Sequence, residues 1–328
     1  MRCTKSTVLA ATVAAAGASA QEFLFTGSNE AGGEFGETEF PGQLGKHYIW
    51  PETDAIDTLA STGMNTFRIA TRMERLVPDD IRGTINETYF EGLQAVVDHV
   101  TGAGNYAVID PHNYGRYYDD IITDVEGFGA FWTTLATRFA DNANVIFDTN
   151  NEYHDMENSL VRDLNQAAID AIRAAGATSQ YIFVEGNAWS GAWSWVSSGN
   201  AEALVDLSDP EDKLIYEMHQ YLDEDSSGTH EECVSATIGV ERVTEATQWL
   251  KDNGKRAILG ETAGANNQVC KDAVKGELQY LLDNSDVWTG WLWWAAGPWW
   301  ADYMFSLEPP SGTAYQELLN DITPFIGA

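Results

Sequence analysis

Residues 145–154 read VIFDTNNEYH, a short apolar run that ends in two asparagines, a glutamate and a histidine. A run of this length and composition is typical of a buried strand. An ordinary turn after it would be rich in glycine or proline. Instead Asn151 and Glu152 bring an amide and an ionisable group to the point where the strand ends. The stretch therefore predicts a strand that delivers a carboxylate to a pocket.

The rest of the chain repeats this pattern of short apolar runs separated by helical segments. Including residues 145–149, the predicted strands lie at 23–28, 66–70, 106–110, 145–149, 181–185, 214–218, 256–260 and 288–294. Between them, apolar residues recur every three or four positions over 90–100, 128–139 and 160–175, which predicts amphipathic helices. Eight strands alternating with helices predict an α/β fold, a single-domain (β/α)8 TIM barrel. An open doubly wound sheet is the alternative, although no glycine-rich phosphate loop follows the first strand.

Chemically active side chains gather at the carboxyl ends of these runs, where a barrel of this kind has its active site. Six of the eight ends carry polar, ionisable or aromatic groups, namely Arg68, His112, Asn151 with Glu152, His219 with Tyr221, Glu261, and Trp293 with Trp294. Glycosidic cleavage requires two carboxylates, one protonated and one ionised, and Glu152 and Glu261 stand on different strands. A separation of about 5 Å would give retention of configuration, and about 6.5–9.5 Å would give inversion.

Each of these residues also has a purely structural interpretation. A lone glutamate after a strand is more often a charge at a helix N-terminus, and a lone histidine is more often a hydrogen-bonded core residue. Glu185 and Glu217 lie in apolar runs and are rival carboxylates. Trp291 and Trp293 are expected to pack the seam that closes the barrel. The coincidence of so many such groups at one end of the fold favours the catalytic interpretation.

Residues 1–20 have the features of a secretory signal peptide: Arg2 and Lys5 come first, an Ala/Val/Leu-rich stretch follows, and the segment ends in Ala-Ser-Ala. We therefore expect a secreted, extracellular protein whose catalytic domain is residues 21–328. In an oxidising compartment the two remaining cysteines, Cys233 and Cys270, are expected to be bonded. Asn86 begins an Asn-Glu-Thr triplet and is a predicted N-glycosylation site.

The charge of the chain is strongly negative, with 18 Lys+Arg against 50 Asp+Glu. Removal of the two basic residues of the signal takes the net charge from −32 to −34. Nucleic acid and anionic membranes are therefore excluded as partners. Twelve tryptophans and thirteen tyrosines fit an uncharged, hydroxyl-rich ligand that stacks on aromatic rings.

The chain resembles glycoside hydrolase family 5, and in particular the secreted fungal endo-β-1,4-glucanases (cellulases) of that family. The resemblance spans nearly all of residues 21–328. It is carried by GSNEAGGEFG at 27–36, TFRIA at 66–70, IDPHNYGRYY at 109–118, IFDTNNEYHDM at 146–156, YEMHQYLD at 216–223, ILGETAG at 258–264 and WLWWAAGPWW at 291–300. Single stretches are weakly specific, whereas all seven in this order are a specific signal.

The resemblance implies a retaining double displacement on internal β-1,4-glucosidic bonds of cellulose and related β-glucans, with no metal or other cofactor. It implies that Glu152 is the acid/base and Glu261 the nucleophile. The implied supporting residues are Arg68 at the nucleophile, Asn151 and His112 at sugar hydroxyls, His219 and Tyr221 beside the two glutamates, and Trp294 under the sugar. It also implies a disulfide between Cys233 and Cys270.

Some expectations go beyond the matching stretches. Trp189 and Trp193, in the loop after the fifth strand, are candidates for further sugar platforms. We expect a monomer whose partner is the β-glucan substrate. Two rival functions stay open from the sequence: an endo-β-mannanase with the same catalytic pair, and a carbohydrate-binding or wall protein without catalysis.

Overall fold

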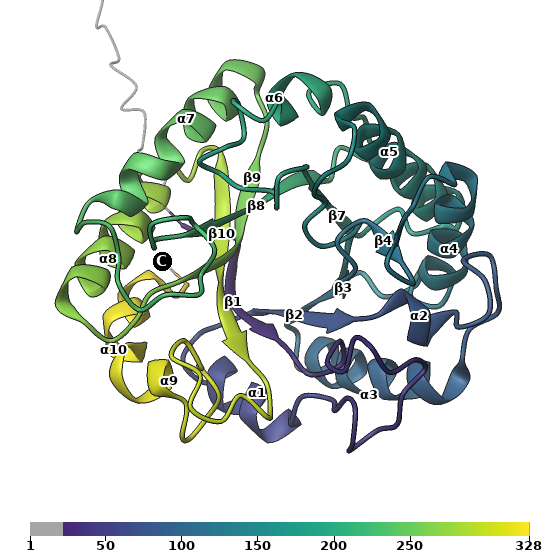
Figure 1. Cartoon of the computed structure of the whole chain (residues 1–328), viewed down its shortest axis with the longest axis horizontal. Helices are drawn as coiled ribbons and strands as arrows, with labels where there is room; N and C mark the ends of the chain where they lie inside the picture. The colour runs from purple at the N-terminus through teal and green to yellow at the C-terminus, as the bar shows by residue number, and fades with distance from the viewer. Residues whose placement is uncertain (1–21, 328) are drawn as a thin grey trace, which may run out of the picture.

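The computed structural model describes residues 22–327, in which helices surround a central set of strands (Figure 1). The predicted signal segment, 1–20, lies outside the described residues. The central strands are β1 (Phe25–Glu30), β2 (Thr66–Thr71), β3 (Tyr106–Pro111), β6 (Val145–Asp148), β7 (Tyr181–Glu185), β8 (Leu214–Tyr221), β9 (Ala257–Ala263) and β10 (Trp288–Ala296). They form a closed barrel in the order β1-β10-β9-β8-β7-β6-β3-β2, with parallel pairing throughout. The predicted (β/α)8 barrel is confirmed, and closure excludes the open sheet.

The helices form the outer layer and cover the outside of the barrel (Figure 1). The longer ones are α1 (Thr53–Ala60), α3 (Glu87–Gly102), α4 (Val125–Thr137), α5 (Asn158–Ala174), α7 (Ile238–Asn253) and α8 (Gln268–Asp283). Short elements complete the chain: α2 (Met73–Leu76), the hairpin of β4 (Arg116–Tyr117) and β5 (Asp120–Ile121), α6 (Asn200–Ala203), α9 (Thr313–Glu317), α10 (Leu319–Ile322) and η1 (Thr323–Phe325). The helices predicted at 90–100, 128–139 and 160–175 correspond to α3, α4 and α5.

An apolar layer fills the barrel interior on the side nearer the amino ends of the strands. Seven strands each contribute one fully buried residue to it: Phe25, Val108, Ile146, Phe183, Ile215, Ile258 and Leu292. Large apolar side chains in such a layer exclude water from the middle of the barrel. Trp291 and Trp293 pack outside this layer with the other core residues and are fully buried, as predicted for the seam.

Four acidic residues follow this apolar layer, each two positions further along its strand. They are Asp110 on β3, Asp148 on β6, Glu185 on β7 and Glu217 on β8, and all are fully buried. Because side chains alternate along a strand, residues two apart share a face, so these carboxyl groups also point into the barrel. The interior therefore changes from apolar to ionisable toward the carboxyl ends of the strands.

A register shift between β8 and β9 turns Glu261 into the barrel. Met218 is opposite Leu259, whereas the next residue, His219, is opposite Glu261, so β9 holds one extra residue at Gly260. A Cβ at Gly260 would lie 1.9 Å from Glu217 Oε1, which explains why glycine occupies this position. A bulge of this kind re-aims the next side chain. The side chains of Glu261 and His219, on neighbouring strands, consequently both point into the barrel.

Candidate active site

Arg68 on β2 is the cation at the centre of the acidic groups. Its side chain is fully buried and forms ion pairs of 2.8–3.1 Å with five carboxylates: Asp110, Asp148, Glu185, Glu217 and Glu261. One guanidinium cannot neutralise five carboxylates, so burial keeps some of them protonated. Consistent with this, burial raises the pKa of Asp148 and of Glu185 well above the ordinary range.

Glu152 and Glu261 lie together at the carboxyl end of the barrel, with His219 between them. One oxygen of each glutamate and one His219 nitrogen all lie within 4.8 Å of one another. His219 Nδ1 is 2.8 Å from Glu152 Oε1 and 3.6 Å from Glu261 Oε2. Glu152 comes from the loop after β6 and Glu261 from β9, so closure of the barrel is what brings them together.

Glu261 is held by a cation on one oxygen and a hydroxyl on the other. Arg68 Nη1 donates to Oε1 at 3.1 Å, and the Tyr221 hydroxyl donates to Oε2 at 2.6 Å. Burial raises the pKa of Glu261, and Glu152 adds to this, while His219 and Arg68 act in the opposite direction. Burial would lower the pKa of His219, but the carboxylates around it, with Glu261 first, raise that pKa well above its ordinary value.

Asn151 and His112 form a second hydrogen-bonded chain at the same end of the barrel, the carboxyl end of its strands. Arg68 Nη2 donates to Asn151 Oδ1 at 2.8 Å, and Asn151 Nδ2 lies 3.2 Å from His112 Nε2. His112 Nδ1 is in turn 2.7 Å from Asp110 Oδ2. The amide can only donate to Nε2, so this network favours the tautomer in which His112 carries its proton on Nδ1. Both side chains are therefore fixed before any ligand arrives.

Aromatic rings in contact with one another form a row that includes His112. Trp294, half-buried at the end of β10, stacks on His112 with the ring centres 5.2 Å apart. The row continues through Tyr114 and His154 to Trp189, with centre-to-centre distances of 5.3, 6.1 and 4.7 Å. Trp189 is about half exposed, at 50 %, and lies nearly parallel to His154. These flat, partly exposed faces suit the apolar faces of sugar rings.

Trp193 stands apart from this row of rings. It is 52 % exposed and packs against the Arg242 guanidinium, whose carbon is 4.7 Å from the ring centre. Ring contacts therefore connect Trp189 to His112 and Trp294, whereas the ring of Trp193 contacts Arg242.

Strained backbone also concentrates in the loops at this end of the barrel. Tyr114, Glu152, Trp189 and Trp299 have φ values of 57°, 48°, 55° and 72°, a region that side chains other than glycine seldom adopt. Such conformations persist only where surrounding contacts fix them, and they cluster at functional sites.

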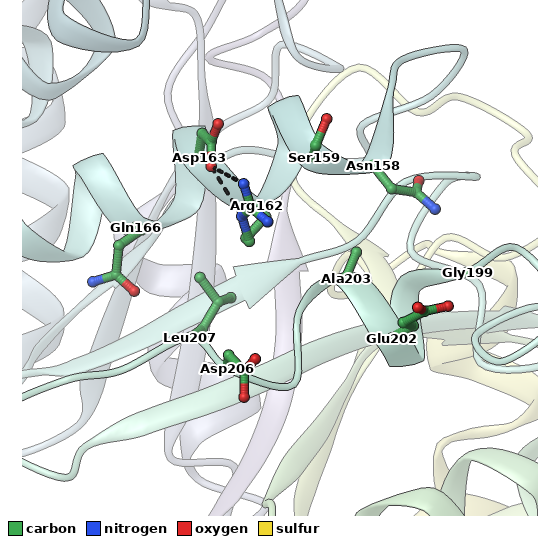
Figure 2. A pocket seen from close by; sticks show the side chains of 10 residues that line it. All are labelled: Asn158, Ser159, Arg162, Asp163, Gln166, Gly199, Glu202, Ala203, Asp206 and Leu207. Atoms are coloured by element: carbon green, nitrogen blue, oxygen red, sulfur yellow. Dashed lines mark hydrogen bonds and ion pairs between the residues drawn. The ribbon is translucent and has the colours of Figure 1, made fainter.

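A cavity of about 530 Å³ opens beside the catalytic rim. Its lining includes Tyr221 and Trp294, together with Tyr303 and the segment 227–229. A second, larger pocket, of about 650 Å³, lies between α5 and the segment around α6. Figure 2 shows the side chains that line it, among them Arg162 paired with Asp163. No predicted catalytic or sugar-binding residue lines that pocket. Glu152 and Glu261 do not line the first cavity either, but Tyr221, which donates a hydrogen bond to Glu261, does.

Among the described residues, three groups of side chains come close enough to hold a cation by distance alone. The first is Glu152, His219 and Glu261, and the second is Asp223, Asp225 and His230. The third is Glu185, Glu217 and His219, whose two carboxylates already form ion pairs with Arg68. In the second group, Asp223 already accepts hydrogen bonds from the backbone of residues 228–230 and from Ser227. In the first group, Glu261 Oε1 already accepts a hydrogen bond from Arg68. The expectation that no metal or cofactor takes part stays a prediction.

The remaining predicted residues lie away from this cluster. Cys233 and Cys270 are bonded, with an S–S distance of 2.01 Å, as predicted. Asn86 is the N-cap of α3, is partly exposed and does not cap that helix with its side chain. Glycosylation there stays a prediction. Among the residues that the structure describes, no helix combines the length and the apolar character needed to cross a membrane.

The sequence did not reveal the full set of acidic groups around Arg68. Asp110 and Asp148 were not among the candidates, and Glu185 and Glu217 were considered only as rivals of the catalytic pair. A signal was present, because each stands two residues after an interior apolar residue on its strand. Tyr114, the link between His112 and His154, was also missed.

Comparison with known proteins agrees with this geometry. A family model described as "Cellulase (glycosyl hydrolase family 5)" matches residues 28–297. The chain is 62 % identical to endo-beta-1,4-glucanase A of Emericella nidulans, covering 98 % of both chains. It is 58 % identical to a probable endo-beta-1,4-glucanase B of Neosartorya fischeri, covering 96 % of this chain and 95 % of the other.

Solved structures are similar over nearly the whole chain. The structure of XacCel5A in complex with cellopentaose has a TM-score of 0.89 and 36 % identity, covering 92 % of this chain and 99 % of that one. Cel5A (EG2) from Hypocrea jecorina has a TM-score of 0.81 and 31 % identity, covering 89 % and 94 %.

Proposed function

The chain belongs to glycosyl hydrolase family 5, the cellulase family, and from this premise we propose that it is a retaining endo-β-1,4-glucanase. Its substrates are cellulose and related β-glucans, which it cleaves at internal bonds by a double displacement. The observation that carries the proposal is the pair Glu152 and Glu261, of which Glu152 is partly exposed and Glu261 buried, with one oxygen of each within 4.8 Å of the other. Carboxyl groups about 5–5.5 Å apart suit direct attack, whereas inversion needs room for a water between them.

In the first step Glu261 attacks the anomeric carbon while Glu152 gives its proton to the departing glycosidic oxygen. A glycosyl ester forms on Glu261 and the chain on the leaving side is released. In the second step Glu152 takes a proton from water, the resulting hydroxide attacks the same carbon, and Glu261 leaves as a carboxylate. Loss of the Glu261 charge in the ester removes a like charge from beside Glu152, which favours its ionised form when it must act as base.

The surrounding residues have separate roles in this scheme. Arg68 and Tyr221 hold and orient the Glu261 carboxylate, with contacts of 3.1 and 2.6 Å, and His219 holds Glu152 at 2.8 Å. Hydrogen bonds of this kind position the reacting atoms before substrate binds. Arg68 also fixes Asn151, which we assign to the sugar's 2-hydroxyl.

Aromatic rings would hold the glucan chain across the barrel mouth. Trp294 is the platform under the sugar at the point of cleavage. The His112 ring is stacked against it and would accept a hydrogen bond from a sugar hydroxyl at Nε2, in place of the Asn151 amide. Trp189 and Trp193 are further platforms, on the strength of their half-exposed faces. The solved neighbour described with cellopentaose supports a linear β-glucan as the ligand.

The same proposal covers the protein's setting. We propose that residues 21–328 act as a secreted, monomeric catalytic domain after removal of 1–20, with a glycan on Asn86 and without a cofactor. The disulfide supports an oxidising compartment.

Reducing-sugar release tests the function directly. Purified 21–328 is incubated with a soluble β-1,4-glucan derivative and with a soluble β-mannan. Glu261→Gln is measured alongside, and the exposed Glu245→Gln on α7 serves as the matched control. We expect release mainly from glucan, with the Glu261 variant below about 1 % of wild type and the control unchanged.

Each other outcome would revise a different part of the proposal. Release mainly from mannan would keep the mechanism and replace the substrate. Binding without release from either polymer would indicate a carbohydrate-binding protein. Activity above a few per cent in Glu261→Gln would remove that residue from the role of nucleophile.

A further inference from the structure

Glu185 is a buried carboxyl group that the double displacement does not use, and it contacts both halves of the catalytic machinery. It ends β7, is 0 % exposed and lies opposite Glu217 in the barrel register. Its Oε2 accepts a hydrogen bond of 2.7 Å from the backbone N–H of Glu152. Its Oε1 accepts one of 3.0 Å from Arg68 Nη2. One side chain thus joins the acid/base to the cation that holds the nucleophile.

The Glu152 backbone needs such a contact. Its φ of 48° lies in the left-handed region, which is unfavourable for a residue other than glycine. The neighbouring residues are fixed through backbone atoms: the Asn151 N–H donates to Pro111 O at 3.1 Å, and the Trp189 N–H donates to Tyr153 O at 3.0 Å. At Glu152 itself, the partner of the N–H is the Glu185 carboxyl group.

The direction of the Glu152 side chain depends on this backbone conformation. If residue 152 relaxed to an ordinary φ, its Cα–Cβ bond would rotate and the carboxyl group would leave the position 2.8 Å from His219 Nδ1. A displacement of about 1 Å in a reacting group can cost on the order of 10²-fold in rate. Glu185 is fully buried, so any effect of its carboxyl group passes through its neighbours. These are Glu152, Arg68 and His219, whose Nε2 lies 3.6 Å from Glu185 Oε1.

We propose that Glu185 is a positioning residue for acid catalysis, which holds the strained backbone of Glu152 so that its proton lies at the glycosidic oxygen. This inference rests on the proposed function, in which Glu152 is the acid/base. It does not require Glu185 to be ionised, because an oxygen of either form accepts a hydrogen bond. Burial raises the pKa of Glu185, opposed by His219, which fits a contact that persists through the acidic range.

Dependence on the leaving group separates positioning of the acid from general structural damage. Aryl β-cellobiosides with a phenyl leaving group need a proton from the acid, whereas 2,4-dinitrophenyl departs without one. The constant kcat/KM reports this first chemical step in both cases. A misplaced acid therefore lowers kcat/KM for the phenyl glycoside and spares the dinitrophenyl glycoside.

The test compares Glu185→Leu, which has similar size and no acceptor, with Glu185→Gln, which keeps one oxygen for the Glu152 N–H. For Glu185→Leu we expect kcat/KM to fall about 10²-fold on the phenyl glycoside and only a few-fold on the dinitrophenyl glycoside. Glu185→Gln should recover most of the loss. If Glu185→Leu does not fold, Glu185→Asp replaces it, since the shorter carboxylate cannot reach both partners and should show the same leaving-group dependence.

Two further variants decide how a negative result is interpreted. Asp148→Asn alters an equally buried partner of Arg68, which accepts from its Nη2 at 2.8 Å and from its Nε at 3.0 Å, and should lower kcat/KM on both substrates alike. An equal loss on both substrates in the Glu185 variants, matching Asp148→Asn, would overturn the positioning role. Glu152→Gln is the benchmark: if it too shows no leaving-group dependence, the acid/base assignment in the proposed function fails as well.

Discussion

The Glu261 carboxylate is the residue whose surroundings define the chemistry most closely. In the proposed mechanism it must be ionised to attack, yet burial raises its pKa, while His219 and Arg68 act to lower it. The Tyr221 hydroxyl, at 2.6 Å, donates to the ionised form and so stabilises it further. The acidic limb of the activity profile should therefore lie above the ordinary glutamate value of 4.5 and depend on Tyr221.

Tyr221→Phe tests this dependence. Loss of a donor to the carboxylate favours its protonated form, so the acidic limb of kcat/KM should move to higher pH by about one unit. Tyr216→Phe, on the same strand, removes a hydroxyl that donates to Leu204 O at 2.8 Å and is the matched control, with no shift expected. Equal pH profiles for wild type and Tyr221→Phe would contradict this account of Glu261.

Individual site residues could be predicted from the sequence only where their position relative to a strand was visible. Arg68, Glu152 and Glu261 were identified because they follow apolar runs, and the structure brings them together. The pattern of apolar and polar residues does not predict contacts between side chains and backbone atoms that are far apart in the chain. Nothing in the sequence shows that Glu185 reaches the Glu152 backbone, because strand curvature and the left-handed residue at 152 decide that contact.

At the scale of elements, the sequence predicted every barrel strand but ended six of them early, by the most at β8 and β9. The runs at 214–218, 256–260 and 288–294 continue in the structure as β8 to Tyr221, β9 to Ala263 and β10 to Ala296. Three of the added residues, His219, Tyr221 and Glu261, belong to the site, and their polar side chains break the apolar pattern that signals a strand. The β4–β5 hairpin was not predicted, since two residues per strand give no periodicity.

The disulfide is the covalent link between two of these elements, the loop after β8 and the start of α8. It joins residues 37 positions apart. Closing a loop of this length in the unfolded chain corresponds to about 3–4 kcal/mol of stabilisation. We expect the double variant Cys233→Ser/Cys270→Ser to lose about that free energy of unfolding in urea, with its kcat on a soluble glucan little changed. An unchanged free energy of unfolding would show that the bond adds no stability.

At the scale of the whole molecule, buried carboxyl groups link stability to pH. Glu277 on α8 is fully buried, accepts a hydrogen bond from Thr262 at 2.7 Å, and burial raises its pKa to about 8 from the ordinary 4.5. Between these values the folded chain binds more protons than the unfolded chain. The free energy of unfolding therefore falls as pH rises through this window, by up to about 5 kcal/mol for this one group.

Glu277→Gln should remove this contribution, because the amide is neutral in both states. Urea unfolding at pH 4, 6 and 8 should show a variant that loses less stability than wild type on going to pH 8. The exposed Glu245→Gln should keep the wild-type dependence, which separates burial from the effect of net charge alone. Parallel curves for Glu277→Gln and wild type would show that Glu277 does not carry this dependence.

The central claim for the whole enzyme is retention through direct attack by Glu261, and the anomeric form of the newly released sugar end tests it. Cellopentaose is hydrolysed at high enzyme concentration and the anomeric protons are followed by NMR before mutarotation. The account predicts that the β anomer appears first and the α anomer only later, as mutarotation proceeds. Early appearance of the α anomer would show inversion and would contradict the role of Glu261 as nucleophile.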